Sequence, residues 1–247
     1  MTDIYRLLKN EAKKRDTGIE LSEEKPDPLY VAKKYADEYI SLICALFAYG
    51  NAKQILKFLN SLDFSLIDKS EDIIQNRLQG YYYRFQNTQD IIEFFKTIRR
   101  FKKESSLQSI FLLGYKKEYS VMDGLRELIS LIYDLNSYRS RGYEFLIGKV
   151  PPQNPKSTYK RWHMYLRWMV REDNLDLGLW KEVEKKDLLV PLDTHTFKLG
   201  KKLGLIKRKS YDFKAVLELS ESFRKIDLND PVKFDFALYR LGQEKLI

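Results

Sequence analysis

Apolar residues recur at the three- and four-residue spacing of a helix along most of the chain, and no stretch alternates apolar with polar residues for long enough to form a sheet. This periodicity predicts helices over residues 4–15, 30–49 as one or two helices, 52–62, 69–79, 88–102, 106–115 and 121–135. Gly50 and Asn51 are predicted to end the helix before them. The chain is therefore predicted to be all-α.

The composition suits a helical protein with a large core. Of the 247 residues, 44% are hydrophobic and 14% aromatic, which fits one large domain or two small lobes. The single cysteine, Cys44, excludes an intramolecular disulfide, a four-cysteine zinc site and an all-cysteine iron–sulfur cluster. His163 and His195 are the only histidines, too few for a zinc triad, so neither a metal nor another cofactor is expected.

The chain has no segment that resembles a membrane span or a signal peptide. No run approaches the roughly 18 uncharged apolar residues of a membrane helix. The first residues lack the apolar stretch of a signal peptide. We therefore expect a cytoplasmic protein that does not bind a membrane.

The positive charge is confined to one region. The formal net charge is +9, from 44 Lys and Arg against 35 Asp and Glu. Residues 139–209 hold 17 basic and 8 acidic residues, which leaves 27 of each sign in the rest of the chain. Such a local surplus is typical of a surface that binds a polyanion such as nucleic acid. A basic surface with no partner is the alternative.

A loop with three prolines and a helix lie within this basic region. Ser157 is the predicted N-cap of the helix. Five residues at helical spacing form a stripe predicted to face the core: Trp162, Tyr165, Leu166, Met169 and Val170. A second face is predicted to be basic and is formed by Lys160, Arg167 and Arg171.

Lys160 is predicted near the third position of this helix, where a lysine can act as a nucleophile. A lysine nucleophile needs an uncharged amine, and the free N–H groups of a helix start favour the neutral form. The same groups attract anions such as DNA phosphate. A solvated lysine at a helix start is the alternative.

Asp193, in the segment PLDTHTFKLGKKLGL, precedes a helix predicted over residues 194–203. An aspartate at this place caps the helix because its carboxylate accepts hydrogen bonds from the free N–H groups. The same bonds fix the carboxylate in direction, which suits a catalytic role. His195, Lys198, Lys201 and Lys202 follow closely and favour an anionic substrate.

This segment resembles the aspartate-containing segment of the helix-hairpin-helix DNA glycosylases, in which Asp-Thr-His opens a helix that leads to a Leu-Gly pair. The whole chain more closely resembles a bacterial family catalogued as domain of unknown function 2400. The matching stretches, from about residue 27 to 243, are DPLYVAKKY, LICALFAYGNAKQI, YYYRFQNTQDI, YKRWHMYLRWMVRED, LGLW, PLDTHTFKLGKKLGL and DPVKFDFALYRLGQ.

The resemblance implies one glycosylase-like domain over residues 1–247, made of two helical lobes with a DNA-binding cleft between them. Residues 139–209 would supply the basic hairpin-helix and the Asp-Thr-His motif. The implied activity is that of a DNA glycosylase and abasic-site lyase on a damaged base in double-stranded DNA. We expect a monomer.

The resemblance also implies roles for single residues. Asp193 matches the catalytic aspartate of the glycosylases, and Lys160 is chosen as the lysine that attacks the sugar C1′ because it opens the preceding helix. Lys156 is the reserve for that role. The residues expected to bind nucleic acid are Lys156, Arg161, Arg167, Arg171, His195, Lys198, Lys201, Lys202, Asn51 and Trp168.

Some of these residues also suit another role. Asn51 stands roughly where related glycosylases carry a residue that probes the gap left by a flipped base, but it also suits a helix C-cap. Trp168 is preferred for stacking on a base over Trp180 and residues 81–83, but a place in the core is the alternative for each of them, and Trp162 is expected in the core. His195 is expected to help order the aspartate loop.

The chain also departs from the common glycosylase pattern. No glycine lies between Val150 and Lys160, where the usual hairpin is rich in glycine. The 33 positions from Lys160 to Asp193 exceed the spacing of the endonuclease branch and resemble some archaeal oxoguanine glycosylases. The four-cysteine cluster of the endonuclease branch is absent. An inactive nucleic-acid-binding module with the same fold is therefore the alternative function, and a basic helical scaffold that binds protein is a third.

Overall fold

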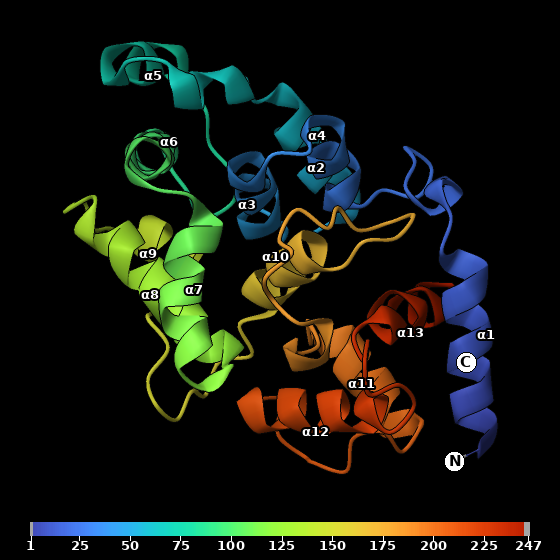
Figure 1. The fold of residues 1–247 in the computed structure, drawn as a ribbon. Coiled ribbons are helices and arrows are strands. Elements are labelled where there is room, and N and C mark those ends of the chain that lie inside the picture. The colour runs from blue at the N-terminus through green and yellow to red at the C-terminus, as the bar shows by residue number, and fades with distance from the viewer. Residues whose placement is uncertain (1, 245–247) are drawn as a thin grey trace. The chain divides into compact units, whose positions relative to one another are not determined.

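The computed structural model describes residues 2–244, which form 13 α-helices, three short 3-10 helices and two isolated β-bridges but no strand (Figure 1). The prediction of an all-α protein is confirmed. The chain divides into two compact units. The central unit is the continuous segment Pro26–Pro152, and the terminal unit joins Met1–Lys25 to Gln153–Ile247.

The central unit holds eight α-helices and one 3-10 helix. They are α2 (Pro28–Tyr35), α3 (Glu38–Leu46), α4 (Ala52–Ser61), η2 (Phe64–Asp68), α5 (Glu71–Arg77), α6 (Thr88–Glu104), α7 (Leu107–Glu118), α8 (Val121–Asp134) and α9 (Arg141–Ile147). Every one begins after an Asp, Asn or Ser whose side-chain oxygen accepts a hydrogen bond from a free backbone N–H. The capping residues thus set where each helix starts.

Apolar burial and close helix contacts hold the central unit together. Residues 39–46 of α3 are all buried, as its almost wholly apolar sequence requires. Helices α7 and α8 lie side by side (Figure 1) and approach closely at two glycines. A Cβ at Gly114 would lie 2.2 Å from the carbonyl oxygen of Asp123, and one at Gly124 would lie 2.5 Å from the Phe111 ring. Only glycine fits these two positions without a shift of the helices.

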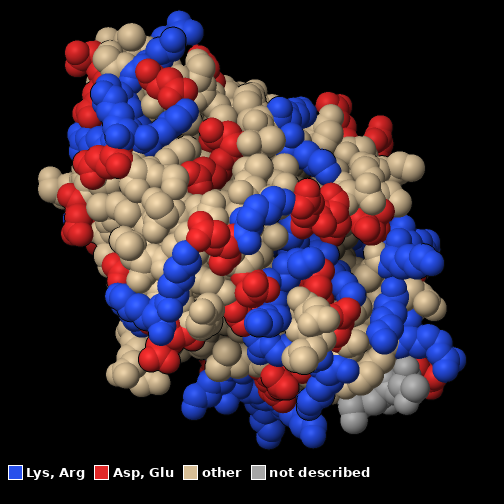
Figure 2. Space-filling view, viewed as in Figure 1, with Lys and Arg blue, Asp and Glu red and all other residues tan. Residues whose placement is uncertain are grey.

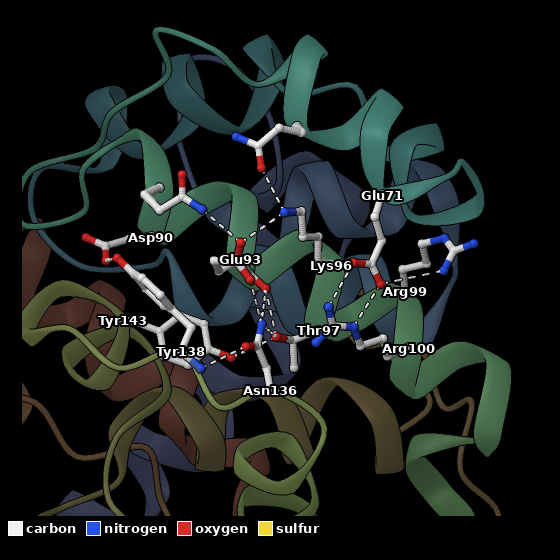
Figure 3. Close-up of polar contacts among 12 residues, drawn as sticks. Glu71, Asp90, Glu93, Lys96, Thr97, Arg99, Arg100, Asn136, Tyr138 and Tyr143 are labelled. Carbon is white, nitrogen blue, oxygen red and sulfur yellow. Dashed lines mark hydrogen bonds and ion pairs between the residues drawn. The ribbon is translucent and has the colours of Figure 1, made fainter.

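Polar side chains of α6 connect it to its neighbours in the central unit (Figure 3). Asn136 donates to the Glu93 carboxylate at 2.9 Å and to the Thr97 hydroxyl at 3.0 Å. Arg100 makes two hydrogen bonds of 2.8 Å to the carboxylate of Glu71 on α5. These contacts fix the segment after α8 and helix α5 against α6.

The terminal unit contains α1 (Thr2–Arg15), η1 (Gly18–Glu20), α10 (Lys160–Val170), η3 (Lys185–Asp187), α11 (Thr194–Lys202), α12 (Phe213–Arg224) and α13 (Lys233–Gln243). Helix α13 packs against α1 and α11 (Figure 1). Arg15 of α1 donates to Glu244 at 2.7 Å, and Arg240 of α13 donates to the carbonyl of Glu20 at 2.7 Å. The first 25 residues are thereby joined to the end of the chain.

Most helices predicted from periodicity are present, and the chain does break between two helices before residue 52, but the prediction that Gly50 and Asn51 end the first of them is wrong. Helix α3 ends earlier, at Leu46, and Asn51 is the N-cap of α4, where its side chain accepts from the N–H groups of Lys53 and Gln54. Asn51 therefore begins a helix and does not end one. Within residues 2–244, no helix is long and apolar enough to cross a membrane.

Candidate active site

Lys160 and Asp193 lie together in the terminal unit, although 33 positions separate them in the sequence. The Nζ of Lys160 is 3.7 Å from the Oδ2 of Asp193. Their side chains are 31% and 21% exposed, so a solute can reach both groups. The structure thus brings together an amine and a carboxylate, each at the start of a helix.

The helix that carries Lys160 begins later than predicted. Lys160 is the first residue of α10 and not the third, and the N-cap is Tyr159, whose side chain makes no capping hydrogen bond. Tyr159 adopts a left-handed conformation with φ 46°, an uncommon backbone for a non-glycine residue. The predicted cap, Ser157, instead accepts a hydrogen bond from the Tyr159 N–H at 3.4 Å. Prediction failed here because a local Ser157 turn precedes the helix.

Asp193 uses its two carboxylate oxygens for different partners. Its Oδ1 accepts a hydrogen bond from the N–H of Thr196 at 2.8 Å and so caps α11, as predicted. Its Oδ2 is the atom that faces Lys160. The capping bond fixes the plane of the carboxylate, and the second oxygen is thereby directed at the amine.

A buried acid, Asp235 of α13, interacts electrostatically with both members of this pair. Asp235 is 6% exposed and accepts a hydrogen bond from Arg167 Nη1 at 2.6 Å. Burial raises the pKa of Asp235 to about 6, the Arg167 charge opposes the rise, and the charges of Asp193 and Lys160 act in opposite directions on it. Asp235 was not among the predicted site residues, although an Asp between two Phe residues signals a buried carboxylate.

Tyr211 forms a second unpredicted neighbour of the pair. Its hydroxyl donates to the carbonyl of Leu192 at 3.0 Å and lies 3.2 Å from the hydroxyl of Thr158. Burial raises the pKa of Tyr211, and the charge of Asp193 adds to the rise. Because it contacts the residue that precedes Asp193 and one that precedes α10, Tyr211 links the two segments that carry the site.

Arg167 and Arg171 do not form the predicted basic face. They are only 4% and 7% exposed, and carboxylates of the same unit neutralise both. Arg167 binds Asp176 and Asp235, and Arg171 binds Asp173, Asp176 and Asp230. Neither guanidinium is available to a phosphate. The segment is helical, as its spacing predicts, but every residue of α10 from Trp162 to Val170 is buried, so this part of the helix has no exposed face.

Trp168 is also misassigned as a residue that stacks on a base. It is 0% exposed and belongs to the core with Trp162 and Trp180, which are 3% and 1% exposed. The expectation that Trp162 lies in the core is confirmed. Of residues 81–83, Tyr83 is buried whereas Tyr82 is 76% exposed.

The other predicted nucleic-acid-binding residues of the basic region are accessible to different degrees. The exposed ones are Lys156, His195, Lys198, Lys201 and Lys202. Arg161 is half-buried. Figure 2 shows Lys and Arg side chains gathered along the lower margin of the view, where α12 lies in Figure 1. Asn51 is exposed but belongs to the central unit.

The described residues contain no group of three or more His, Cys, Asp or Glu that could hold a metal ion. Cys44 is buried in α3, and burial raises the pKa of its thiol. His163 is buried in α10.

The family model of proteins of unknown function designated DUF2400 matches residues 27–244. The chain belongs to this family. The match covers all of the central unit except Pro26, together with α10 to α13, so it includes Lys160 and Asp193. No curated protein and no solved structure matches the chain.

Proposed function

We propose that this DUF2400 chain is a DNA-repair glycosylase of the helix-hairpin-helix type with abasic-site lyase activity. The observation that supports it most is the 3.7 Å approach of the Lys160 amine to the Asp193 carboxylate at the starts of α10 and α11. A nucleophile beside a fixed carboxylate suits attack on a sugar carbon. The all-helical fold and the Asp-Thr-His motif agree with this proposal.

The first step would be displacement of the damaged base. The deprotonated Lys160 amine attacks C1′ of the deoxyribose, so that the Nζ–C1′ bond forms and the bond from C1′ to the base nitrogen breaks. The Asp193 carboxylate stabilises the positive charge that develops on the sugar, and it accepts the proton released from the attacking nitrogen. That proton then passes to the departing base.

The second step would cleave the strand. The lone pair on Nζ then expels O4′, so that the C1′–O4′ bond breaks, O4′ takes up a proton from water, and a protonated imine forms between Nζ and C1′. Loss of a proton from C2′ then expels the phosphate oxygen at C3′, which is β-elimination. Hydrolysis of the imine by water releases Lys160. Asp193 is the only carboxylate that the structure places in ion-pair contact with Lys160 among the described residues, so we assign the C2′ proton transfer to it.

The substrate proposed is double-stranded DNA because the exposed cations of the terminal unit suit a phosphate backbone. Lys198, Lys201 and Lys202 lie on the helix that Asp193 caps, and Lys156 precedes α10. The backbone N–H groups at the start of α10 add partial positive charge near Lys160. Phosphates flanking the damaged sugar would be held there.

Borohydride trapping tests the lysine assignment directly, because the reagent reduces the imine to a stable covalent adduct. We expect wild-type protein to be trapped on duplexes with an abasic site or an oxidised base, and Lys160→Ala to give no adduct. Lys209→Ala is the matched control, since Lys209 is an exposed lysine of the same unit. An adduct that survives Lys160→Ala but disappears in Lys156→Ala would move the role to Lys156.

Asp193→Asn separates chemistry from capping. Asparagine caps a helix about as well as aspartate, so the fold should be retained while the charge beside Lys160 is removed. We expect normal DNA binding and a loss of roughly 10²- to 10⁴-fold in the single-turnover cleavage rate. Asp37→Asn is the control, because Asp37 caps α3 of the central unit in the same way.

An inactive nucleic-acid-binding module is the second candidate function. The observation that favours it is the connection from α9 to α10, residues 148–159, which contains no helix and has no glycine after Gly148. A wild-type protein that binds damaged duplexes but neither cleaves them nor forms an adduct would support the module and contradict the enzyme.

A further inference from the structure

The central unit exposes a cluster of aromatic rings and one arginine, which we call the aromatic tip: Tyr49, Arg84, Phe85 and Phe145. Tyr82 precedes this cluster by two residues in the same segment. The rings of Tyr49 and Phe85 are parallel within 4°, with centroids 6.2 Å apart. The ring centroid of Phe145 of α9 is 5.1 Å from that of Tyr49 and 4.9 Å from that of Phe85. Tyr82, Phe85 and Phe145 are 76%, 59% and 43% exposed. Such exposure of neighbouring aromatic residues is unusual unless something binds to them.

The backbone beneath the tip is held in place by buried hydrogen bonds. Residues 83–86 form a tight turn in which the N–H of Tyr83 donates to Gln86 at 3.0 Å and the N–H of Gln86 donates back at 2.9 Å. The Gln86 side chain is 2% exposed; its amide donates to the carbonyl of Gly142 at 2.8 Å and accepts from the hydroxyl of Tyr49. Arg84 and Phe85 are therefore projected outward from a rigid base.

Arg84 occupies a strained conformation that the surroundings impose. Its φ is 53°, in the left-handed region that bulky residues rarely adopt. Its guanidinium lies against Gly50, where a Cβ would come within 2.8 Å of a guanidinium nitrogen. The charge sits 5.8 Å from the Tyr49 ring centre and 5.7 Å from that of Phe85. The two-residue turn between Tyr83 and Gln86 requires such a φ at its first central residue, so the turn holds Arg84 in this conformation.

Helix α9, which carries Phe145, is held in place at its start by Asp90 of α6, whose contact with Tyr138 is drawn in Figure 3. Asp90 of α6 accepts hydrogen bonds from Tyr138 at 3.0 Å and from the α9 cap, Ser140. A Cβ at Gly142 would lie 2.1 Å from the same carboxylate, so only glycine permits this approach. The three ring-bearing segments of the tip are thus preorganised.

The charge on these segments indicates what binds there. Residues 47–61, 78–87 and 139–149 carry six basic residues, Lys53, Lys57, Arg84, Arg139, Arg141 and Lys149, and one acidic residue, Glu144. The rest of the central unit carries 12 basic and 14 acidic residues. All six cations are exposed. Aromatic faces beside cations suit stacked bases joined by phosphates, whereas an apolar protein surface would not select this charge.

We propose that the aromatic tip is a binding site for an unpaired base of DNA, which stacks on Phe85 while Arg84 and the other cations of these segments hold the flanking phosphates. The site requires no chemistry at Lys160, so it goes beyond the proposed function. Binding at the tip and trapping at Lys160 are separate measurements, and either can fail alone.

The test uses the full chain and two duplexes, one fully paired and one with a single bulged 2-aminopurine. Stacking on an aromatic ring quenches 2-aminopurine fluorescence, and anisotropy of an end label gives the affinity. We expect wild type to quench the bulged base and to prefer the bulged duplex. Phe85→Leu should remove the quenching and weaken bulge binding roughly 5- to 100-fold, the range typical of one stacked base.

Two matched variants control for general effects. Tyr119→Leu removes another aromatic of the central unit, 65% exposed, and Arg77→Ala removes another exposed arginine, so both should behave as wild type. Arg84→Ala should weaken both duplexes. Equal quenching by Phe85→Leu and wild type, or equal losses in Phe85→Leu and Tyr119→Leu, would overturn the proposal even if borohydride trapping succeeds.

Discussion

His163 lies inside the terminal unit, 1% exposed and stacked on Phe213 with ring centroids 6.3 Å apart. Among residues 2–244 neither of its ring nitrogens has a hydrogen-bond partner. Burial lowers the pKa of His163 from 6.5 to about 3, because the interior does not solvate the imidazolium. The unfolded chain therefore binds a proton between pH 6.5 and pH 3 that the folded chain does not, and stability falls as the pH drops through this window.

His163→Leu should remove that pH dependence. The free energy of unfolding should change little at pH 8, whereas at pH 5 the variant should be more stable than wild type by about 2 kcal/mol. Urea unfolding at both pH values measures the difference. His195→Leu replaces the other histidine, which is exposed, and is the control; its free energy of unfolding should stay within about 0.5 kcal/mol of wild type. An equal shift at pH 5 and pH 8 would show that packing and not protonation is responsible.

At the scale of elements, α10 carries charge into the core. Arg167 and Arg171 face Asp176, Asp230 and Asp235, so removing one partner leaves a buried unpaired charge. Arg167→Leu should lower the free energy of unfolding by roughly 3–5 kcal/mol, measured by chemical denaturation. Lys198→Leu, on exposed α11 surface, should stay within about 0.5 kcal/mol. A stable Arg167→Leu variant with weakened DNA binding would restore the phosphate-contact role.

The same helix marks what sequence could and could not predict. Helix positions followed from local periodicity and caps, as at Asp193, whose capping bond reaches only three residues ahead. Asp173 and Asp176 are near Arg167 and Arg171 in the sequence, but their other partners, Asp235 and Asp230, lie 68 and 59 positions away. Local spacing therefore does not indicate that these arginines are buried. Asp193 was predicted from the Asp-Thr-His motif and Lys160 from its place at the start of the preceding helix. The sequence around Asp235 indicates that it is buried, but only the fold places Asp235 and Tyr211 near this pair.

At the scale of the whole molecule, the two units differ in how the chain builds them. The central unit is continuous, whereas the terminal unit includes the N-terminal segment up to residue 25, all of which precedes the family match that begins at residue 27. Arg240, 2% exposed, donates to the Glu20 carbonyl at 2.7 Å and lies 3.3 Å from its carboxylate. Glu20 also pairs with Arg15 and Lys25. The buried carboxylate of Glu20 thus balances the charge of the buried Arg240 guanidinium.

Glu20→Ala should therefore destabilise the terminal unit from within. The substitution leaves the Arg240 guanidinium without its carboxylate in the interior, at a cost of roughly 3–5 kcal/mol. Hydrogen exchange read by mass spectrometry should show lost protection in α1, α10, α11, α12 and α13, with α2 to α9 unchanged, because the units have separate cores. Ile19→Ala changes a neighbouring residue that is 79% exposed, so protection from hydrogen exchange in both units should equal that of wild type. Equal loss of protection across α2 to α9 would instead show that the chain unfolds as one cooperative body, with Glu20 stabilising all of it.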